Sequence, residues 1–225
     1  MKHLAVITSF YGSQERRKLT LEQLSKYVSE NNEVILVDAN KVPAKSIPNE
    51  VTYLHLPASS IYEALNYGIM HTKADYYIIC GDDDILNIKL IKEGLNLGKG
   101  SDIIIGEVKS GSHVFHPLKR NFPFSHLNYI SQHSVGIIVK RNLHVYTGLY
   151  DTNLKIASDA KFILEAYMQK FNFQVVDLEF GSYGDQGVSS TNKKKAYYEM
   201  ACISLTYNKY LSSLYYFVRS IKEMI

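Results

Sequence analysis

Residues 74–84 read ADYYIICGDDD, an apolar run that ends in a glycine and three consecutive aspartates. The stretch from Tyr76 to Cys80 is continuously apolar rather than alternating, which is typical of a strand buried on both faces of a parallel sheet. Ligands of such a sheet bind at the carboxyl ends of its strands. Asp82, Asp83 and Asp84 therefore stand where this topology predicts a site.

Three earlier runs have the same character, at His3–Thr8, Glu33–Val37 and Val51–Leu54. The segments between them, Gln14–Ser29 and Ser59–Met70, place apolar residues at helical spacing. Strands that alternate with helices predict βαβ units in a right-handed, doubly wound α/β sheet.

The second half of the chain is less regular. Strands are expected at Asp102–Gly106, Ser134–Val139 and Phe173–Leu178, and a helix over Ser158–Phe171. The stretch Lys109–Asn128 is rich in His, Pro, Ser and Phe, and it is expected to be a long functional loop.

The composition is that of a globular protein of 225 residues, with 46% hydrophobic and 21% charged side chains. It excludes a disordered tail, a collagen and a coiled coil. The net charge of +3 is too small to indicate nucleic acid as the main partner. We expect neither a bilayer-spanning segment nor a signal peptide, and two distant cysteines fit a reducing, cytoplasmic setting.

The aspartate triplet predicts a metal site. Three adjacent carboxylates raise one another's pKa, so an ordered triplet needs a compensating positive charge. Mg²⁺ and Mn²⁺ prefer oxygen ligands and supply such a charge. The alternative is a solvated acidic turn, but the position after a buried strand favours the metal.

The triplet also belongs to a longer pattern. Residues 61–69 (IYEALNYGI), then residues 74–78 (ADYYI) and the acidic triplet, resemble the "YDAMN-x-GI … GDY … DD" stretch of family 2 glycosyltransferases of the GT-A fold. Further resemblances follow in the family's order at residues 131–134 (SQHS), 148–151 (GLYD), 156–159 (IASD) and 187–190 (GVSS). Several weak motifs in the correct order are more specific than any single one.

The resemblance implies one GT-A catalytic domain over residues 1–192 and a C-terminal helical segment over 193–225. In the domain, a Rossmann-like nucleotide-sugar half (1–105) merges with a smaller, mixed-sheet acceptor half (106–192). The implied reaction is the inverting, metal-assisted transfer of a sugar from a UDP-, GDP- or dTDP-type donor to a glycan or lipid-linked acceptor. The implied process is bacterial cell-surface polysaccharide synthesis.

The resemblance also assigns roles to the acidic residues. Asp84 matches the last acid of the family motif and is expected to be the direct ligand of Mn²⁺ or Mg²⁺. Asp82 and Asp83 would contact the metal, its waters or the ribose. Asp159 is the expected catalytic base, which takes the proton of the acceptor hydroxyl. Its alternative role is a helix N-cap, unless Ser158 is the cap.

The remaining expected contacts concern the nucleotide and the acceptor. Asp38 would bind the base of the nucleotide; the alternative is an ordinary acidic residue in a turn. Thr8 and Phe10 would line the same pocket, although Phe10 could instead pack in the core. Asn66 would lie beneath the diphosphate, and His133 would face the acceptor or the leaving phosphate.

Two departures from the family pattern leave the donor base open. Residues 9–12 are SFYG instead of P-x-YN-x-E, and residues 38–40 are DAN at the start of the usual DDGSTD.

The tail from Asn192 to Ile225 has six basic and two acidic residues, and Leu211, Leu214, Tyr215, Val218 and Ile221 recur at helical spacing. This stripe is expected to pack on the catalytic core or to form a homodimer. Alternatively, the segment rests on an anionic membrane at the inner face of the cell, as a peripheral contact.

Two other functions compete with the transferase. A sugar nucleotidyltransferase would carry a glycine-rich, basic loop after the first strand, whereas residues 8–17 contain one glycine, Gly12. A nucleotide-sugar-binding module without turnover would lack a base, and Asp159 argues against it.

Overall fold

The computed structural model of the chain describes residues 3–117, 124–130, 133–184 and 192–223. The described strands form one mixed sheet in the order β3-β2-β1-β4-β8-β6-β9-β5, with β7 paired to β6. The strands are β1 (Leu4–Phe10), β2 (Asn32–Asp38), β3 (Thr52–His55), β4 (Tyr76–Ile79), β5 (Ile85–Leu86), β6 (Ile103–Ser110), β7 (His113–Phe115), β8 (Ile137–Lys140) and β9 (Phe173–Ser182).

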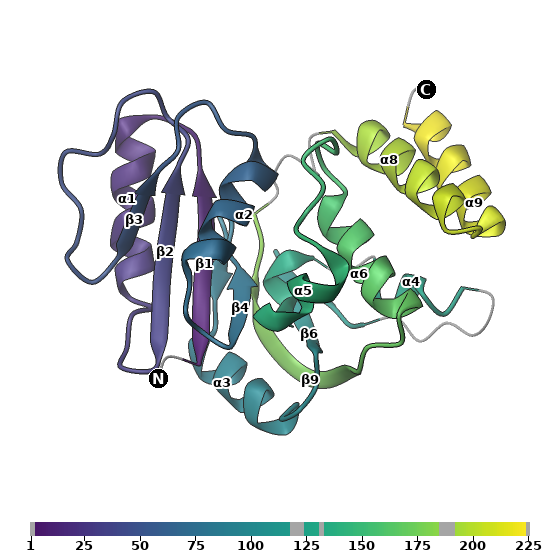
Figure 1. Cartoon of the computed structure of the whole chain (residues 1–225), viewed down its shortest axis with the longest axis horizontal. Helices are drawn as coiled ribbons and strands as arrows, with labels where there is room; N and C mark the ends of the chain where they lie inside the picture. The colour runs from purple at the N-terminus through teal and green to yellow at the C-terminus, as the bar shows by residue number, and fades with distance from the viewer. Residues whose placement is uncertain (1–2, 118–123, 131–132, 185–191, 224–225) are drawn as a thin grey trace.

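The first half of the sheet is parallel, as the sequence predicts. β1 pairs in parallel with both β2 and β4, and β2 with β3. The register places Ile7 opposite Ile79 and Phe10 opposite Asp38. The carboxyl ends of β1, β2 and β4 therefore share one edge of the sheet, and Figure 1 shows the arrowheads of β1 and β2 at the same end of the molecule.

Helices cover both faces of this parallel half. They are α1 (Gln14–Ser25) and α2 (Ile61–His71), whereas α3 (Ile88–Leu97) packs against β6 and β9. Successive residues of β1 point to opposite faces. Leu4 and Val6 pack in one core cluster with residues of α1 and α3, whereas Ala5 and Ile7 pack in a second cluster with residues of α2. Burial on both faces explains why these strands are continuously apolar in the sequence.

Gly68 lets α2 approach the sheet closely. A Cβ at this position would lie 2.7 Å from Ile7 Cγ2 and 3.2 Å from Val37 Cγ2. Both distances are shorter than ordinary van der Waals contact, so the helix lies at a distance that a side chain would prevent.

The second half of the sheet is mixed, as the family resemblance implies, and two of the expected segment bounds are wrong. β8 lies antiparallel between β4 and β6, whereas β9 is parallel to β6. The strand expected over Ser134–Val139 begins with a 3-10 turn (Ser134–Gly136) and becomes extended at Ile137. The loop expected from Lys109 is also wrong at its start. There Gly111 turns the chain in the left-handed region, with φ of +57°, and β7 pairs back on β6.

Helices α4 (Leu127–Ile130), α5 (His144–Thr147) and α6 (Ser158–Met168) cover the second half of the sheet, on the side of the cluster that contains Ala5 and Ile7. The C-terminal helices α8 (Lys193–Thr206) and α9 (Tyr210–Lys222) form a hairpin beyond them (Figure 1). Met200 and Ile203 of α8 belong to the same core cluster as Phe162 of α6.

The stripe singled out in α9 does not pack on the core. Its members are exposed; Leu211 and Leu214, for example, are 58% and 60% accessible. The buried residues of α9 are instead Ser212, Tyr216 and Ser220, spaced four apart. The expectation that the stripe covers the catalytic core is therefore wrong, because α8 contacts the opposite face of the helix.

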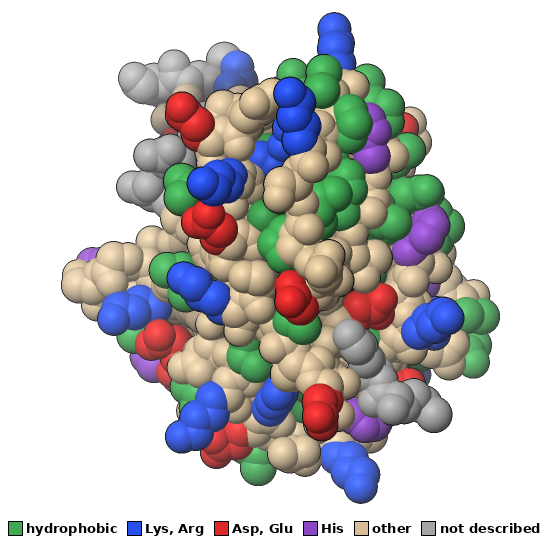
Figure 2. All heavy atoms as spheres, turned by 90° about the vertical axis from the view of Figure 1, so that its left-hand side faces the viewer, with side chains coloured by type: hydrophobic (Ala, Val, Ile, Leu, Met, Phe, Trp, Pro, Cys, Tyr) green, Lys and Arg blue, Asp and Glu red, His purple; other side chains and the backbone are tan. Residues whose placement is uncertain are grey.

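The surface at the β3 edge mixes both signs of charge. Figure 2 shows Lys and Arg side chains interspersed with Asp and Glu on this face, with scattered hydrophobic groups between them. Among the described helices, none is long and apolar enough to cross a membrane.

Candidate active site

The turn between β4 and β5 holds the three aspartates at the shared carboxyl edge of the sheet. β5 pairs with the end of β9, where Ile85 lies opposite Ser182. Two segments about 100 residues apart, the acidic turn and residues 182–184, therefore meet at this edge.

The carboxylate of Asp84 accepts two hydrogen bonds from backbone N–H groups. Its Oδ2 accepts a hydrogen bond from Gly81 N at 2.7 Å and its Oδ1 accepts one from Gly184 N at 3.4 Å. The side chain is 4% exposed, and burial raises its pKa to about 6. Both oxygens therefore hold the acidic turn and residue 184 in place, and the metal contact expected of Asp84 stays a prediction.

Asp83 has the carboxylate oxygen that lacks a partner. Its Oδ2 is buried and has no hydrogen bond from any described residue. A Cβ at Gly184 would collide with this oxygen, so the backbone of residue 184 passes directly beside it. An unpaired buried carboxylate oxygen is costly unless a cation or a donor group satisfies it.

Asp82 faces α1. Its Oδ2 lies 2.6 Å from Arg16 Nε, and the guanidinium is partly exposed. Burial raises the pKa of Asp82 and the Asp83 charge adds to the rise, although Arg16 opposes both. The sequence analysis missed Arg16; its signal was the position in the first turn of the helix that follows β1.

The next residue, Arg17, pairs with Asp38 at the end of β2. Arg17 Nη1 donates to Asp38 Oδ2 at 2.6 Å, Tyr53 Oη donates to the same oxygen at 2.6 Å, and Asn40 donates to Oδ1 through its backbone and its amide. Burial alone would raise the pKa of Asp38, but these hydrogen bonds hold it below the usual value. Asp38 is completely buried, and its carboxylate joins α1 and β3 to the end of β2. Its expected contact with the nucleotide base stays a prediction.

Three further residues expected near the nucleotide are buried, and their contacts with it stay predictions. Thr8 and Phe10 are 0% and 1% exposed and lie in the core rather than on an open pocket. Asn66 donates through Nδ2 to Tyr150 O at 2.8 Å and accepts from Tyr150 N at 3.0 Å through Oδ1. Its amide thus joins α2 to the second half of the chain.

His133 lies near Asp83 of the acidic turn, and its expected contact with the acceptor or the leaving phosphate stays a prediction. Its ring stacks on Tyr183 with the centroids 4.2 Å apart and the planes 9° apart. Burial lowers the pKa of His133 to about 4, although the charge of Asp83 opposes the change. The imidazole is therefore neutral near pH 7, and its Nδ1 accepts from Val135 N at 3.4 Å.

Asp159 lies in the first turn of α6 and is tied to α2. Its Oδ1 accepts from Tyr62 Oη at 3.2 Å and from Ala160 N at 2.8 Å. Tyr62 is in the first turn of α2, which follows β3, so this contact places Asp159 at the carboxyl edge of the sheet. Burial raises the pKa of Asp159, with the nearby Glu199 charge adding to the effect.

The cap of α6 comes from distant residues. The N-cap position is Ala157, and Ser158 Oγ is buried without a described partner, so neither expected cap is correct. Tyr62 Oη accepts from Ser158 N at 3.1 Å. The chain before the helix is held by Glu199 of α8 instead.

Glu199 binds three successive backbone N–H groups. Its Oε1 accepts from Lys155 N at 3.0 Å, and its Oε2 accepts from Ile156 N at 2.9 Å and Ala157 N at 3.0 Å. The side chain is 7% exposed. Sequence reasoning missed this residue, because nothing local indicates a partner more than 40 residues away.

Comparison with known proteins identifies the family. Residues 5–150 match the model described as glycosyl transferase family 2. The chain belongs to glycosyl transferase family 2. No curated protein sequence matches it.

Solved structures resemble this family 2 chain over most of its length. One is Staphylococcus aureus TarS residues 1–349, with a TM-score of 0.67, 17% identity, and coverage of 91% of this chain and 65% of that one. The same TarS fragment in complex with UDP-GlcNAc has a TM-score of 0.67 and 17% identity, and the match covers 91% of this chain and 66% of that one. A third is the mannosyltransferase PcManGT from Pyrobaculum calidifontis, in complex with GDP-Man and Mn²⁺. Its TM-score is 0.64 and its identity 12%, and the match covers 92% of this chain and 64% of that one.

At these identities the likeness shows the fold, and it confirms the GT-A prediction. The chain spans 65% of TarS 1–349 and 39% of the longer TarS chain.

The acidic turn of this family 2 chain has carboxylate oxygens of the kind that hard cations prefer. Among the described residues, no group of three or more His, Cys, Asp or Glu side chains is arranged to hold a metal. Two oxygens remain suitable, the unpartnered Oδ2 of Asp83 and a carboxylate oxygen of Asp82. Mg²⁺ commonly takes one or two protein carboxylates and completes its shell with water and substrate phosphate.

Two of the family resemblances lie outside the described residues. They are Ser131 and Gln132, which precede His133, and residues 187–190.

Proposed function

We propose that this chain is an inverting glycosyltransferase that moves a sugar from a nucleoside diphosphate donor to a hydroxyl of a glycan or lipid-linked acceptor. The observation that carries the proposal is that an acidic turn with an unpartnered carboxylate oxygen and the half-buried carboxylate of Asp159 lie at one edge of a GT-A sheet. Family membership and the UDP-GlcNAc and GDP-Man complexes of the structural neighbours support a nucleotide-sugar donor.

The donor would bind at the acidic turn. Asp83 and Asp82 would hold Mn²⁺ or Mg²⁺, and Asp84 would keep the turn in shape through its two backbone hydrogen bonds. The cation would neutralise charge on the departing diphosphate. The partly exposed guanidinium of Arg16 would add positive charge on the same side.

Asp159 would act as the general base. The acceptor oxygen attacks the anomeric carbon and its proton passes to Asp159, while the bond from that carbon to the diphosphate oxygen breaks and the nucleoside diphosphate leaves with the electron pair. A single displacement inverts the anomeric centre. A raised pKa makes the Asp159 carboxylate a better proton acceptor than a solvated aspartate.

His133 and Tyr183 would form a wall of the donor site. Because the imidazole is neutral near pH 7, it would contribute hydrogen bonding and packing rather than charge. The family resemblance motivates a role in bacterial surface polysaccharide synthesis on the cytoplasmic side of the membrane.

The test combines donor binding with turnover. Thermal shifts are measured with UDP-, GDP- and dTDP-sugars, with and without Mn²⁺, for the native protein and for Asp83→Asn and Asp159→Asn. We expect one donor class to stabilise the native protein only with metal, and Asp83→Asn to lose this effect. Asp159→Asn should keep the shift and lose turnover at least about 100-fold.

The matched control is Asp75→Asn, the same change in an exposed residue at the amino end of β4. It should keep both binding and turnover. Turnover that survives Asp159→Asn would disprove the base assignment, and binding without any turnover in the native protein would favour a nucleotide-sugar-binding module.

A further inference from the structure

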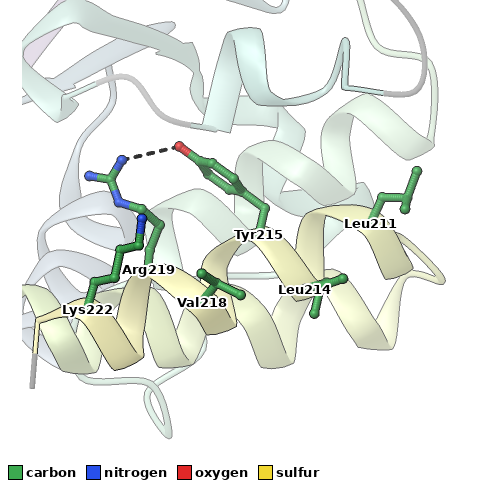
Figure 3. A pocket seen from close by; sticks show the side chains of 6 residues that line it. All are labelled: Leu211, Leu214, Tyr215, Val218, Arg219 and Lys222. Atoms are coloured by element: carbon green, nitrogen blue, oxygen red, sulfur yellow. Dashed lines mark hydrogen bonds between the residues drawn. The ribbon is translucent and has the colours of Figure 1, made fainter.

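The outer face of α9 is apolar along its whole length. The side chains of Tyr210, Leu211, Leu214, Phe217, Val218 and Ile221 are each at least 43% exposed. At 100° per residue they fall within an arc of about 120°. Figure 3 shows Leu214, Val218 and Lys222 on one side of α9, where they help line a shallow hollow of about 320 Å³.

This arrangement is the reverse of an ordinary surface helix, which turns its apolar stripe inward. Ser212 and Ser220 are buried against the rest of the protein, while leucines of the same helix face outward. An exposed apolar stripe of this length marks an interaction surface.

Basic side chains gather at one end of the hairpin, where α8 begins and α9 ends. Ser220 Oγ donates to Lys194 O at 3.1 Å and Arg219 Nη2 donates to Tyr197 Oη at 2.7 Å, so these two ends lie together. The exposed cations of this end are Lys193, Lys194, Lys195, Arg219 and Lys222. Within residues 192–223, the exposed carboxylate is Glu223, because Glu199 is buried.

An apolar stripe beside a cluster of cations is complementary to an anionic lipid surface. A second copy of the chain fits less well. A second copy would present the same hairpin, which within residues 192–223 has five exposed cations at its basic end and one exposed carboxylate, Glu223. It therefore offers little negative charge to the basic end, whereas lipid phosphates offer much.

We propose that the α8–α9 hairpin is a docking surface for an anionic lipid bilayer. The outer face of α9 lies among the headgroups and acyl-chain boundary, and the basic end contacts the lipid phosphates. Glu199 of the same hairpin holds the chain just before Asp159, so the docked hairpin also brings the acceptor side of the site next to the bilayer. This last consequence rests on the proposed function, whereas the docking itself does not.

The test is co-sedimentation of the full chain with two kinds of vesicle. One is phosphatidylcholine alone, and the other is phosphatidylcholine with about 30% phosphatidylglycerol, which is anionic. We expect the protein to bind the anionic vesicles and to bind the neutral vesicles little. Binding to the anionic vesicles should weaken in about 0.5 M NaCl, because salt screens the attraction between the cations and the lipid phosphates. Leu214→Asp should lower the partition coefficient at least about tenfold. Lys222→Glu should lower it at least about fivefold.

The matched control is Leu19→Asp, which changes a leucine of α1 that is just as exposed as Leu214. It should bind vesicles as the native protein does, and circular dichroism should show that both leucine variants are folded. Equal binding of the native protein and Leu214→Asp, or no binding to anionic vesicles, would overturn the proposal. A dimer by light scattering that Leu214→Asp converts to monomer, without vesicle binding, would assign the surface to a second copy instead.

Discussion

Replacing Glu199 with alanine should destabilise the protein and displace Asp159 at the same time. The carboxylate accepts three backbone hydrogen bonds, from Lys155, Ile156 and Ala157. Water can replace the bond at Lys155, which is exposed, but the other two N–H groups are buried or half-buried.

The expected magnitude follows from those two groups. A buried donor left without a partner costs about 1–3 kcal/mol, and the lost acceptor is charged. The free energy of unfolding should therefore fall by about 3–5 kcal/mol. This is a large part of the free energy of unfolding of a typical domain, which is roughly 5–15 kcal/mol. At about 2–4 °C per kcal/mol, the melting temperature should fall by roughly 10 °C.

The variant Glu199→Gln separates the two effects of Glu199, which are its hydrogen bonds to the chain before Asp159 and its negative charge near Asp159. An amide with its oxygen at the Oε2 position keeps two of the three hydrogen bonds and places its NH₂ group against Lys155 N, at a cost of about 1–2 kcal/mol. It also removes a negative charge that raises the pKa of Asp159, after the larger effect of burial. Because the base works deprotonated, activity falls as the pH drops through this pKa, and the glutamine variant should keep activity to a lower pH.

The assays are urea unfolding and the pH profile of kcat/KM. Glu223→Ala, an exposed acid in the same hairpin, is the control and should change neither. A loss below about 1 kcal/mol in the alanine variant would refute the account of the hydrogen bonds. An unchanged acidic limb in a folded, active Glu199→Gln variant would refute the electrostatic link to Asp159.

Three other substitutions test how the sheet and the site are held. Asp38→Asn should cost about 3 kcal/mol in urea unfolding at pH 7, since it leaves a buried guanidinium unpaired. The folded pKa of Asp38 lies below its usual value, so its stabilisation is present above the unfolded pKa and is lost as the pH falls through the folded one, and the variant should differ least from the native protein in acid. Asn66→Ala removes two hydrogen bonds to the Tyr150 backbone and should cost about 2–3 kcal/mol by the same measurement, with donor affinity unchanged. Gly68→Ala should lower the melting temperature through a loss of about 1–3 kcal/mol, since its Cβ would lie 2.7 Å from Ile7 Cγ2; a melting temperature equal to that of the native protein would show that α2 can move away from the sheet.

The sequence by itself determined the parallel half of the fold and the edge that carries the acidic turn. Continuous apolar runs are the direct record of strands buried on both faces, and helical spacing records the faces of α1 and α2. The position of the aspartates followed from a general rule about strand ends, and the family from motifs in order. These inferences depend on residues that are near one another in the chain.

Only the tertiary structure decided what individual side chains do at that edge. Asp83 and Asp84 are neighbours of the same type, yet one binds backbone N–H groups and the other has an unpartnered oxygen, because Gly184 arrives from 100 residues away. Asp38 ends β2 in the sequence, but only the folded chain places Arg17 and Tyr53 against its carboxylate.

The same limit explains Glu199 and the orientation of α9. Periodicity shows which residues share one face of a helix, but not which face a neighbouring element will cover. α8 covers the side of α9 that carries Ser212, Tyr216 and Ser220, and the leucine stripe faces outward as a result. Contacts between distant segments assign such roles, and they exist only once the chain has folded.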